Sequence, residues 1–158
     1  MRDRLVRTFA RWIKVATFAL IACALSSCGN GWKKCHPAQG KIVLDGSPLE
    51  GAEVWLFPTD EKLLNTNPPV RPYGKSGKDG SFTLMTYVAG DGAPQGKYKA
   101  RVICERPVKG AAGEVGGDDD RGQRKNMLAA KYGDPEASGL VVTINPGNNT
   151  LPDFNLKK

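Results

Sequence analysis

The chain contains one histidine, His36, and this limits the catalytic chemistry that its 158 residues can support. A Ser–His–Asp triad would depend on His36, which lies in a segment that we expect to be a solvated linker. Metal sites built from several histidines are excluded as well. Residues 118–120 are three consecutive aspartates, but they lack the alternating spacing of a calcium-binding loop and are expected to be solvated. The sequence therefore predicts no catalytic residue, no metal and no cofactor, and we expect that the chain is not an enzyme.

A second kind of chemistry is available at Cys28. Residues 1–14 are basic, and residues 15–25 form an apolar run that is too short to span a bilayer, which takes about 20 residues. The sequence at 25–28, Leu-Ser-Ser-Cys, resembles the lipobox of bacterial lipoproteins. The resemblance implies a signal peptide cut between Ser27 and Cys28, and a cysteine sulfur that carries fatty acyl chains such as palmitate.

Cys23 is an alternative site of lipid attachment, because residues 20–23, Leu-Ile-Ala-Cys, also fit a permissive lipobox. Cleavage there would leave a shorter apolar run before the cut and two apolar residues after it. Cys28 is instead followed by Gly29, Asn30 and Gly31, which suit a polar tether, so Cys28 is preferred. Two acyl chains are enough for stable anchoring. We therefore expect a lipoprotein on the extracytoplasmic (periplasmic) face of a bacterial cell membrane or outer membrane.

The charge of the chain is unevenly distributed. Its formal net charge of +7 comes largely from residues 1–27, which hold five basic residues and one acidic residue, while the rest is nearly balanced. Lys97, Lys99 and Arg101 alternate with apolar residues, a pattern that predicts the solvated face of a strand. No basic stripe with interleaved aromatic residues follows in the sequence, so we expect no nucleic-acid partner.

Cys35 and Cys104 are the cysteines that remain after the lipobox. Cysteines exported to an oxidising compartment tend to pair, so one prediction is a Cys35–Cys104 disulfide. The alternative is that Cys104, which falls among the inward residues of its strand, is a buried thiol and that Cys35 is free.

These residues must be positioned by short strands, which alternate with strong turn signals from residue 39 onward. Residues 105–139 interrupt the pattern, with a glycine-rich loop followed by one or two turns of helix expected within Gln123–Tyr132, where Leu128 and Tyr132 would face the sheet. The spacing predicts an antiparallel all-β sandwich. Its seven strands are expected at Gln39–Leu44, Ala52–Phe57, Tyr73–Ser76, Ser81–Tyr87, Lys97–Cys104, Leu140–Asn145 and Leu151–Lys157.

Three segments in order resemble the carboxypeptidase regulatory-like, transthyretin-like domain. Residues 40–54 are similar to its opening pattern G-x-V-x-x-x-G-x-P-x-x-G-A-x-V, residues 78–82 to D-x-x-G-x-F/Y, and residues 96–98 to G-x-Y. The resemblance, which extends to small bacterial lipoproteins built on this domain, implies a seven-stranded prealbumin-like Greek-key sandwich. The expected organisation is a signal peptide at 1–27, a flexible tether at 28–38 and the sandwich at 39–158.

Enzymes that share this architecture use histidines that the chain lacks. Hydroxyisourate hydrolases use more than one histidine, and intradiol dioxygenases bind iron through two. We therefore expect a structural or adhesive module that binds a protein or a glycan at the cell envelope. The alternative is a carrier of a small molecule or an oligosaccharide, which would need a concave pocket lined by aromatic residues. The sequence does not say which of Trp32, Trp55 and Tyr73 are exposed, so both hypotheses stay open.

Overall fold

The structure, a computed structural model, describes residues 31–107 and 124–158. The expected signal peptide, the expected cleavage site at Ser27, the cysteines Cys23 and Cys28 and the aspartates at 118–120 lie outside these residues. Residues from Gly31 onward belong to one compact unit, so the folded domain begins earlier than the expected residue 39. Among the described residues, no helix has the length and apolarity needed to cross a bilayer.

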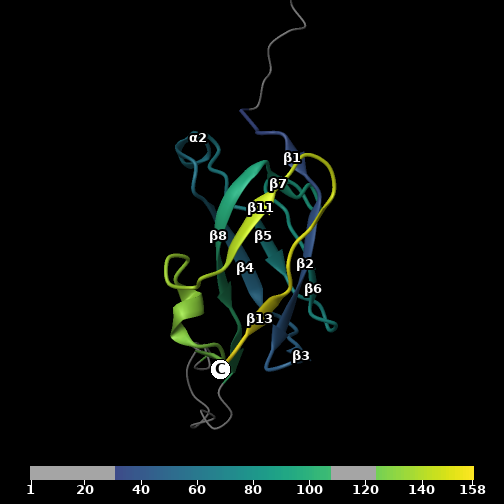
Figure 1. Cartoon of the computed structure of the whole chain (residues 1–158), viewed down its shortest axis with the longest axis vertical. Coiled ribbons are helices and arrows are strands. Elements are labelled where there is room, and N and C mark those ends of the chain that lie inside the picture. Colours follow the sequence, from purple (N-terminus) through teal and green to yellow (C-terminus); the bar gives the residue numbers. More distant parts are fainter. Residues whose placement is uncertain (1–30, 108–123) are drawn as a thin grey trace, which may run out of the picture. The chain divides into compact units, whose positions relative to one another are not determined.

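One sheet has four strands, all antiparallel to their neighbours, in the order β11-β8-β4-β5 (Figure 1). Their side chains alternate, so that one set is buried and the other faces outward, as an amphipathic sheet requires. The predicted alternation of β8 is confirmed, with Tyr98, Ala100 and Val102 buried. The strands are β4 (Glu53–Pro58), β5 (Tyr73–Lys75), β8 (Gly96–Ile103) and β11 (Val141–Ile144).

The second sheet is built around β2 (Ala38–Leu44). Two short strands from the end of the chain, β12 (Asn149–Thr150) and β13 (Phe154–Leu156), pair with β2 in parallel. β3 (Ser47–Pro48) and β6 (Ser81–Thr83) pair with β2 in antiparallel fashion. The all-β expectation is confirmed in this general form, although the parallel pairing at the end of the chain differs from the expected antiparallel arrangement.

A single hydrophobic core lies between the inward faces of the two sheets. Ile42 and Leu56, one from each sheet, are fully buried, and the Phe82 and Phe154 rings approach within 5.8 Å between centroids. Tyr98 is also fully buried, and its hydroxyl donates to the carbonyl oxygen of Pro94 at 2.7 Å. This hydrogen bond satisfies the polar end of an otherwise apolar ring.

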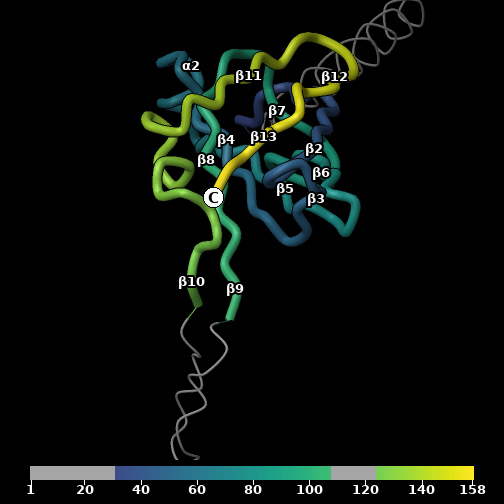
Figure 2. The backbone as a smooth tube through the Cα atoms, turned by 60° about the horizontal axis from the view of Figure 1, so that its bottom comes forward, coloured from purple at the N-terminus to yellow at the C-terminus, as the bar shows by residue number. Residues whose placement is uncertain are grey.

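The one or two turns of helix expected within Gln123–Tyr132 are present only at the end of this segment, and Leu128 and Tyr132 are buried in the core as expected. Arg124–Asn126 instead forms β10, which pairs with β9 (Glu105–Pro107), and the two strands lie side by side in Figure 2. The Asn126 side chain fixes this pairing, because its oxygen accepts the backbone N–H groups of Cys104 and Leu128. Only a 3-10 helix follows, η2 (Ala130–Gly133), and it places Tyr132 in the core.

Cys35 and His36, which the sequence places in a flexible tether, belong to a strand of the folded domain. Cys35–His36 forms β1, which pairs with β7 (Ala93–Pro94). His36 is therefore a buried residue of the domain rather than a solvated linker residue, and its Nδ1 accepts the backbone N–H of Gly147 at 3.0 Å. A Cβ on Gly92 would lie 1.8 Å from the carbonyl oxygen of His36, so the backbones of these two residues can approach this closely only because residue 92 is glycine.

A short helix, α2 (Glu61–Leu64), was also not predicted. Asp60 caps it, because the Asp60 side chain accepts the backbone N–H of Lys62.

The structure does not form the Cys35–Cys104 disulfide, and both thiols are free. Cys35 pairs with Pro94, just before β8 begins, whereas Cys104 directly follows the end of that strand. Eight residues of strand span about 26 Å, while a disulfide needs Cα atoms within about 7 Å. The alternative to the disulfide, a buried Cys104 thiol and a free Cys35, is what the structure shows.

Candidate functional site

The outward face of the four-stranded sheet brings aromatic and basic side chains together. Lys97, Lys99 and Arg101 point outward from β8, as the sequence predicts, and the structure adds rings from the neighbouring strands. We call this surface the aromatic–basic face. Its members are Trp55, Phe57, Arg71, Tyr73, Lys97, Lys99 and Arg101.

Strand register aligns these side chains in rows. Trp55 of β4 lies opposite Arg101 of β8 on one side and Tyr73 of β5 on the other, and Phe57 lies opposite Lys99. Cross-strand neighbours are close enough for their side chains to interact. The Trp55 and Tyr73 rings lie 4.5 Å apart between centroids and are tilted by 49°, so they form one continuous aromatic surface.

Phe57 and Arg71 form a second ring-and-cation unit on this face. The Arg71 guanidinium lies 5.2 Å from the centroid of the Phe57 ring, which is a cation–π distance. Phe57 is half-buried, while Arg71 is exposed. The guanidinium is therefore held above a ring while its polar edge stays accessible.

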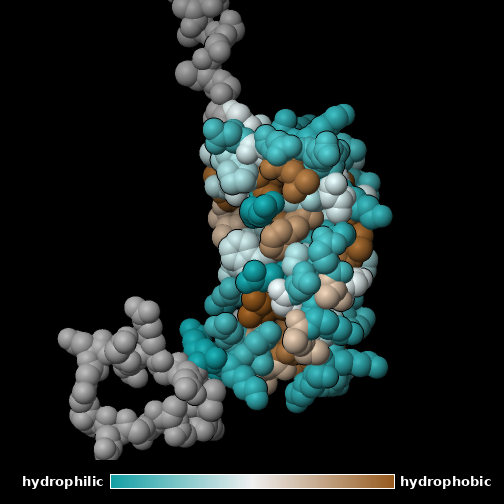
Figure 3. Space-filling view, turned by 90° about the vertical axis from the view of Figure 1, so that its left-hand side faces the viewer, coloured by the Kyte–Doolittle hydropathy of each residue, from teal (hydrophilic) through white to brown (hydrophobic). Residues whose placement is uncertain are grey.

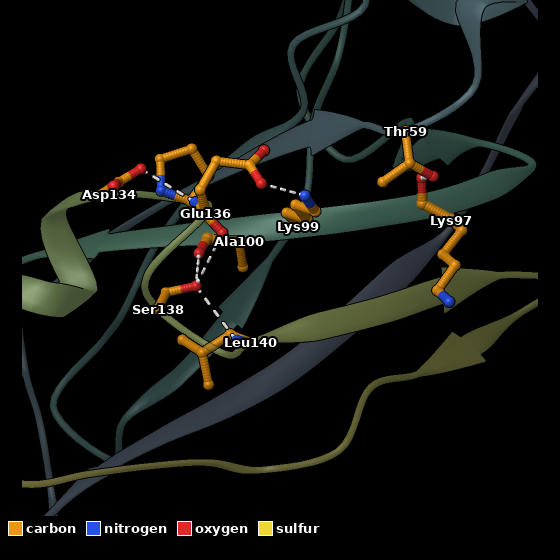
Figure 4. Close-up of polar contacts among 9 residues, drawn as sticks. Thr59, Lys97, Lys99, Ala100, Asp134, Glu136, Ser138 and Leu140 are labelled. Atoms are coloured by element: carbon orange, nitrogen blue, oxygen red, sulfur yellow. Dashed lines mark hydrogen bonds and ion pairs between the residues drawn. The ribbon is translucent and has the colours of Figure 1, made fainter.

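Two ion pairs occupy opposite borders of the face. Lys75 lies 3.7 Å from Glu53, and Lys99 pairs with Glu136, as Figure 4 shows. Glu136 is held in place by its own loop, because its backbone N–H donates to the Asp134 side chain at 3.0 Å. Surface ion pairs of this kind add little stability, so their effect here is on the local charge of the face.

The same loop is attached to β8 through Ser138, which is buried. The Ser138 hydroxyl donates to the carbonyl oxygen of Ala100 at 2.7 Å and accepts the N–H of Leu140 at 3.1 Å. In Figure 4 the Lys99 ammonium is directed toward Glu136, whereas the Lys97 ammonium is directed away from it. The loop thus neutralises one cation of the face and leaves its neighbour on β8 available.

Arg71, Lys97 and Arg101 form no ion pair within the described residues. The Nε atom of Arg101 is buried and has no hydrogen-bond partner among the described residues, so the inner part of this side chain lies against the sheet. Burial, followed by the charge of Glu53, raises the pKa of Tyr73 above its usual value. The face therefore presents flat rings, a phenol hydroxyl and unneutralised cations.

This composition suits a ligand with both flat apolar surface and negative charge. Trp, Tyr and Arg are also the residues most enriched where proteins bind partners tightly. Figure 3 shows the side of the molecule on which β8 lies in Figure 1. Apolar and hydrophilic residues are interspersed over this surface. Within the described part of the chain, no group of three or more His, Cys, Asp or Glu residues could hold a metal ion.

The outward face of the other sheet is a useful contrast, because it carries no aromatic side chain from β2, β6 or β13. Its members are small, polar or aliphatic, and Lys41 is their one basic residue. They are Gln39, Lys41, Val43, Ser81, Thr83 and Asn155.

The candidate residues identified from the sequence lie in different parts of the structure. Trp55 and Tyr73 meet on the aromatic–basic face, where both are half-buried, whereas Trp32 is exposed and stacks on Tyr87. His36 lies in β1, which belongs to a different sheet from the one that carries this face. Phe57 and Arg71 were missed, although the alternation of Phe57 with buried neighbours in β4 was a signal for the first of them.

Comparisons with known proteins give little. No family model matches the chain, and no curated protein matches it either. One solved structure with some likeness is a 9R-lipoxygenase from Cyanothece PCC8801, with 13% identity and a TM-score of 0.39. The match covers 78% of this chain but only 16% of the lipoxygenase chain.

The lipoxygenase match corrects one expectation from the sequence. That protein is an enzyme, so the expectation that this chain is not an enzyme does not stand. At this TM-score and identity the likeness carries no argument for an activity, a substrate or a cofactor in this chain.

Proposed function

We propose that the chain is a lipid-anchored module on the extracytoplasmic face of a bacterial membrane, and that it binds a protein or glycan of the cell envelope. The domain would be a relative of the carboxypeptidase regulatory-like, transthyretin-like sandwich. The observation that carries the binding role is the aromatic–basic face, which gathers rings and unneutralised cations on only one of the two sheets.

The charge and shape of this face favour an anionic polymer as the ligand, such as an acidic polysaccharide. A pyranose ring has a flat apolar surface that matches the exposed parts of Trp55 and Tyr73. Arg71, Lys97 and Arg101 would neutralise the carboxylate or phosphate groups between such rings. A sheet face several strands wide can contact successive units of a polymer.

The anchor rests on the sequence of residues 25–28 and on the basic and apolar segments before it. Cys28→Ala is expected to abolish labelling of the protein by radioactive palmitate and to leave an unprocessed precursor. Labelling that persists in this variant but is lost in Cys23→Ala would move the anchor to Cys23.

Binding is tested with the mature lipoprotein, purified in detergent, and acidic or neutral polysaccharide fractions of the envelope. Removing a central aromatic or arginine anchor from an interface typically costs about 2 kcal/mol, or roughly thirtyfold in Kd. We expect Trp55→Ala and Arg101→Ala each to weaken binding of the acidic fraction by about this factor. Added salt should weaken binding as well, because exposed charges are screened.

Lys41→Ala is the matched control, since it removes one positive charge from the outward face of the other sheet. It should bind the acidic fraction like the unmodified protein. Equal affinities for Lys41→Ala and Arg101→Ala would show that the aromatic–basic face is not the binding surface.

A further inference from the structure

A second exposed aromatic group lies where the chain enters the domain. The Trp32 ring stacks on Tyr87, with 4.9 Å between centroids and 6° between planes, yet Trp32 keeps 47% of its surface exposed. Val88, the next residue of the same loop, is 52% exposed, and Lys33 and Lys34 are exposed beside Trp32. We call Trp32, Tyr87 and Val88 the entry patch.

The entry patch is held in place by the fold. The Asp91 carboxylate accepts the backbone N–H groups of Thr86, Tyr87 and Val88 at 2.7, 3.0 and 3.3 Å, which fixes the loop. The N–H of Lys33 donates to the Tyr87 hydroxyl at 3.2 Å, so the N-terminal segment is joined to the loop. Aromatic surface that is exposed and also held rigidly is prepared for a contact.

The length of chain outside the domain indicates what this contact is. Trp32 follows Cys28 by four residues, and four residues span at most about 14 Å when fully extended. The polar interface on each side of a bilayer is itself roughly 5–8 Å thick. A lipid on Cys28 would therefore keep the entry patch within reach of the headgroup layer.

The chemistry of the patch fits that layer. Trp and Tyr are enriched at membrane interfaces, where an apolar ring with a polar edge is well solvated. Lys33 and Lys34 carry positive charge to the same place and would attract anionic headgroups. We propose that the entry patch docks on the surface of the bilayer that holds the anchor, with Trp32 and Val88 among the headgroups. This inference rests on the lipid anchor at Cys28 in the proposed function.

Tryptophan fluorescence separates the two surfaces of the domain. Removal of residues 1–27 leaves Trp32 and Trp55 as the tryptophans of the mature chain. Trp55→Phe therefore reports Trp32 alone, and Trp32→Phe reports Trp55 alone. Each mature lipoprotein is reconstituted into vesicles of phosphatidylethanolamine with phosphatidylglycerol as the anionic component, with and without lipids brominated near the top of the acyl chain.

We expect brominated lipid to remove most of the Trp32 emission and to leave the Trp55 emission unchanged. Trp32 emission that is not quenched, in a protein that floats with the vesicles, would overturn the docking and leave the anchor intact. A protein that does not float with the vesicles would refute the anchor and the docking together. The two failures are therefore distinguishable.

Charge reversal gives an independent test in the Trp55→Phe background. Lys33→Glu combined with Lys34→Glu should reduce the quenching of Trp32 while flotation is retained. Lys157→Glu combined with Lys158→Glu changes the charge equally at the far end of the chain and should leave the quenching unchanged. Equal quenching in the two double variants would contradict a contact with anionic headgroups.

Discussion

Asp91 should be one of the residues on which the stability of the domain depends most. Asp91→Ala removes three hydrogen bonds to the loop at 86–88, but the Val88 N–H is exposed and can turn to water. The bonds to Thr86 and Tyr87 are partly buried, and a hydrogen bond to a charged acceptor contributes about 1.5–3 kcal/mol. We therefore expect a loss of about 3 kcal/mol in the free energy of unfolding, which lowers Tm by about 10 °C in a domain of this size.

The assay is thermal unfolding followed by circular dichroism, with Asp79→Ala as the control. Asp79 has the same local role, since its carboxylate accepts the N–H and the hydroxyl of Ser81, but it is fully exposed. Its replacement should lower Tm far less. Similar shifts for the two variants would refute the reasoning, because they would show that loop capping at Asp91 contributes no more than an exposed turn.

The remaining predictions concern the cysteines and the core. Burial is the main reason why the pKa of Cys35 rises from 9.0 to about 11, so its alkylation by iodoacetamide at pH 8 should be about a hundredfold slower than that of an ordinary thiol. The rate should keep rising above pH 9, where ordinary thiols reach a plateau, and native stability should fall over the same range because the unfolded thiol ionises first. The denatured, unreduced protein should show both Cys35 and Cys104 as free thiols. Ser76→Ala should lower the free energy of unfolding by about 2–4 kcal/mol in urea titrations. The buried Ser76 hydroxyl accepts the backbone N–H of Ala52 and donates to the carbonyl oxygen of Leu49, and both hydrogen bonds would be lost. The exposed Ser81→Ala should change it far less, and equal losses would contradict this role.

The strands could be predicted because their signals are local. Alternation of apolar and polar residues placed β2, β4 and β8 within a residue or two of their observed bounds, and it identified the outward set of β8. Turn residues such as Gly46 and Gly80, both with positive φ, marked where the strands end.

The remaining features depend on contacts between distant residues. His36 became buried because Gly92 allows its backbone to pass closely and Gly147 donates to its ring, and neither partner is visible from the sequence around it. The first part of the segment at 123–132 is a strand rather than a helix because the Asn126 side chain joins it to Cys104. The aromatic–basic face was missed for the same reason, because only strand register places Trp55 between Arg101 and Tyr73.

The parallel pairing of β2 with β13 has a mechanical consequence. In a parallel pair, the start of one strand and the end of the other lie at opposite ends of the pair, so a pull applied to those two points acts along both strands. The strands can separate only by sliding past each other, which loads all of their hydrogen bonds at once. The equivalent bonds of an antiparallel hairpin pulled at its open end break one after another. A domain held at its N-terminal side and pulled from its C-terminal side is therefore loaded in the direction in which this sheet resists extension best.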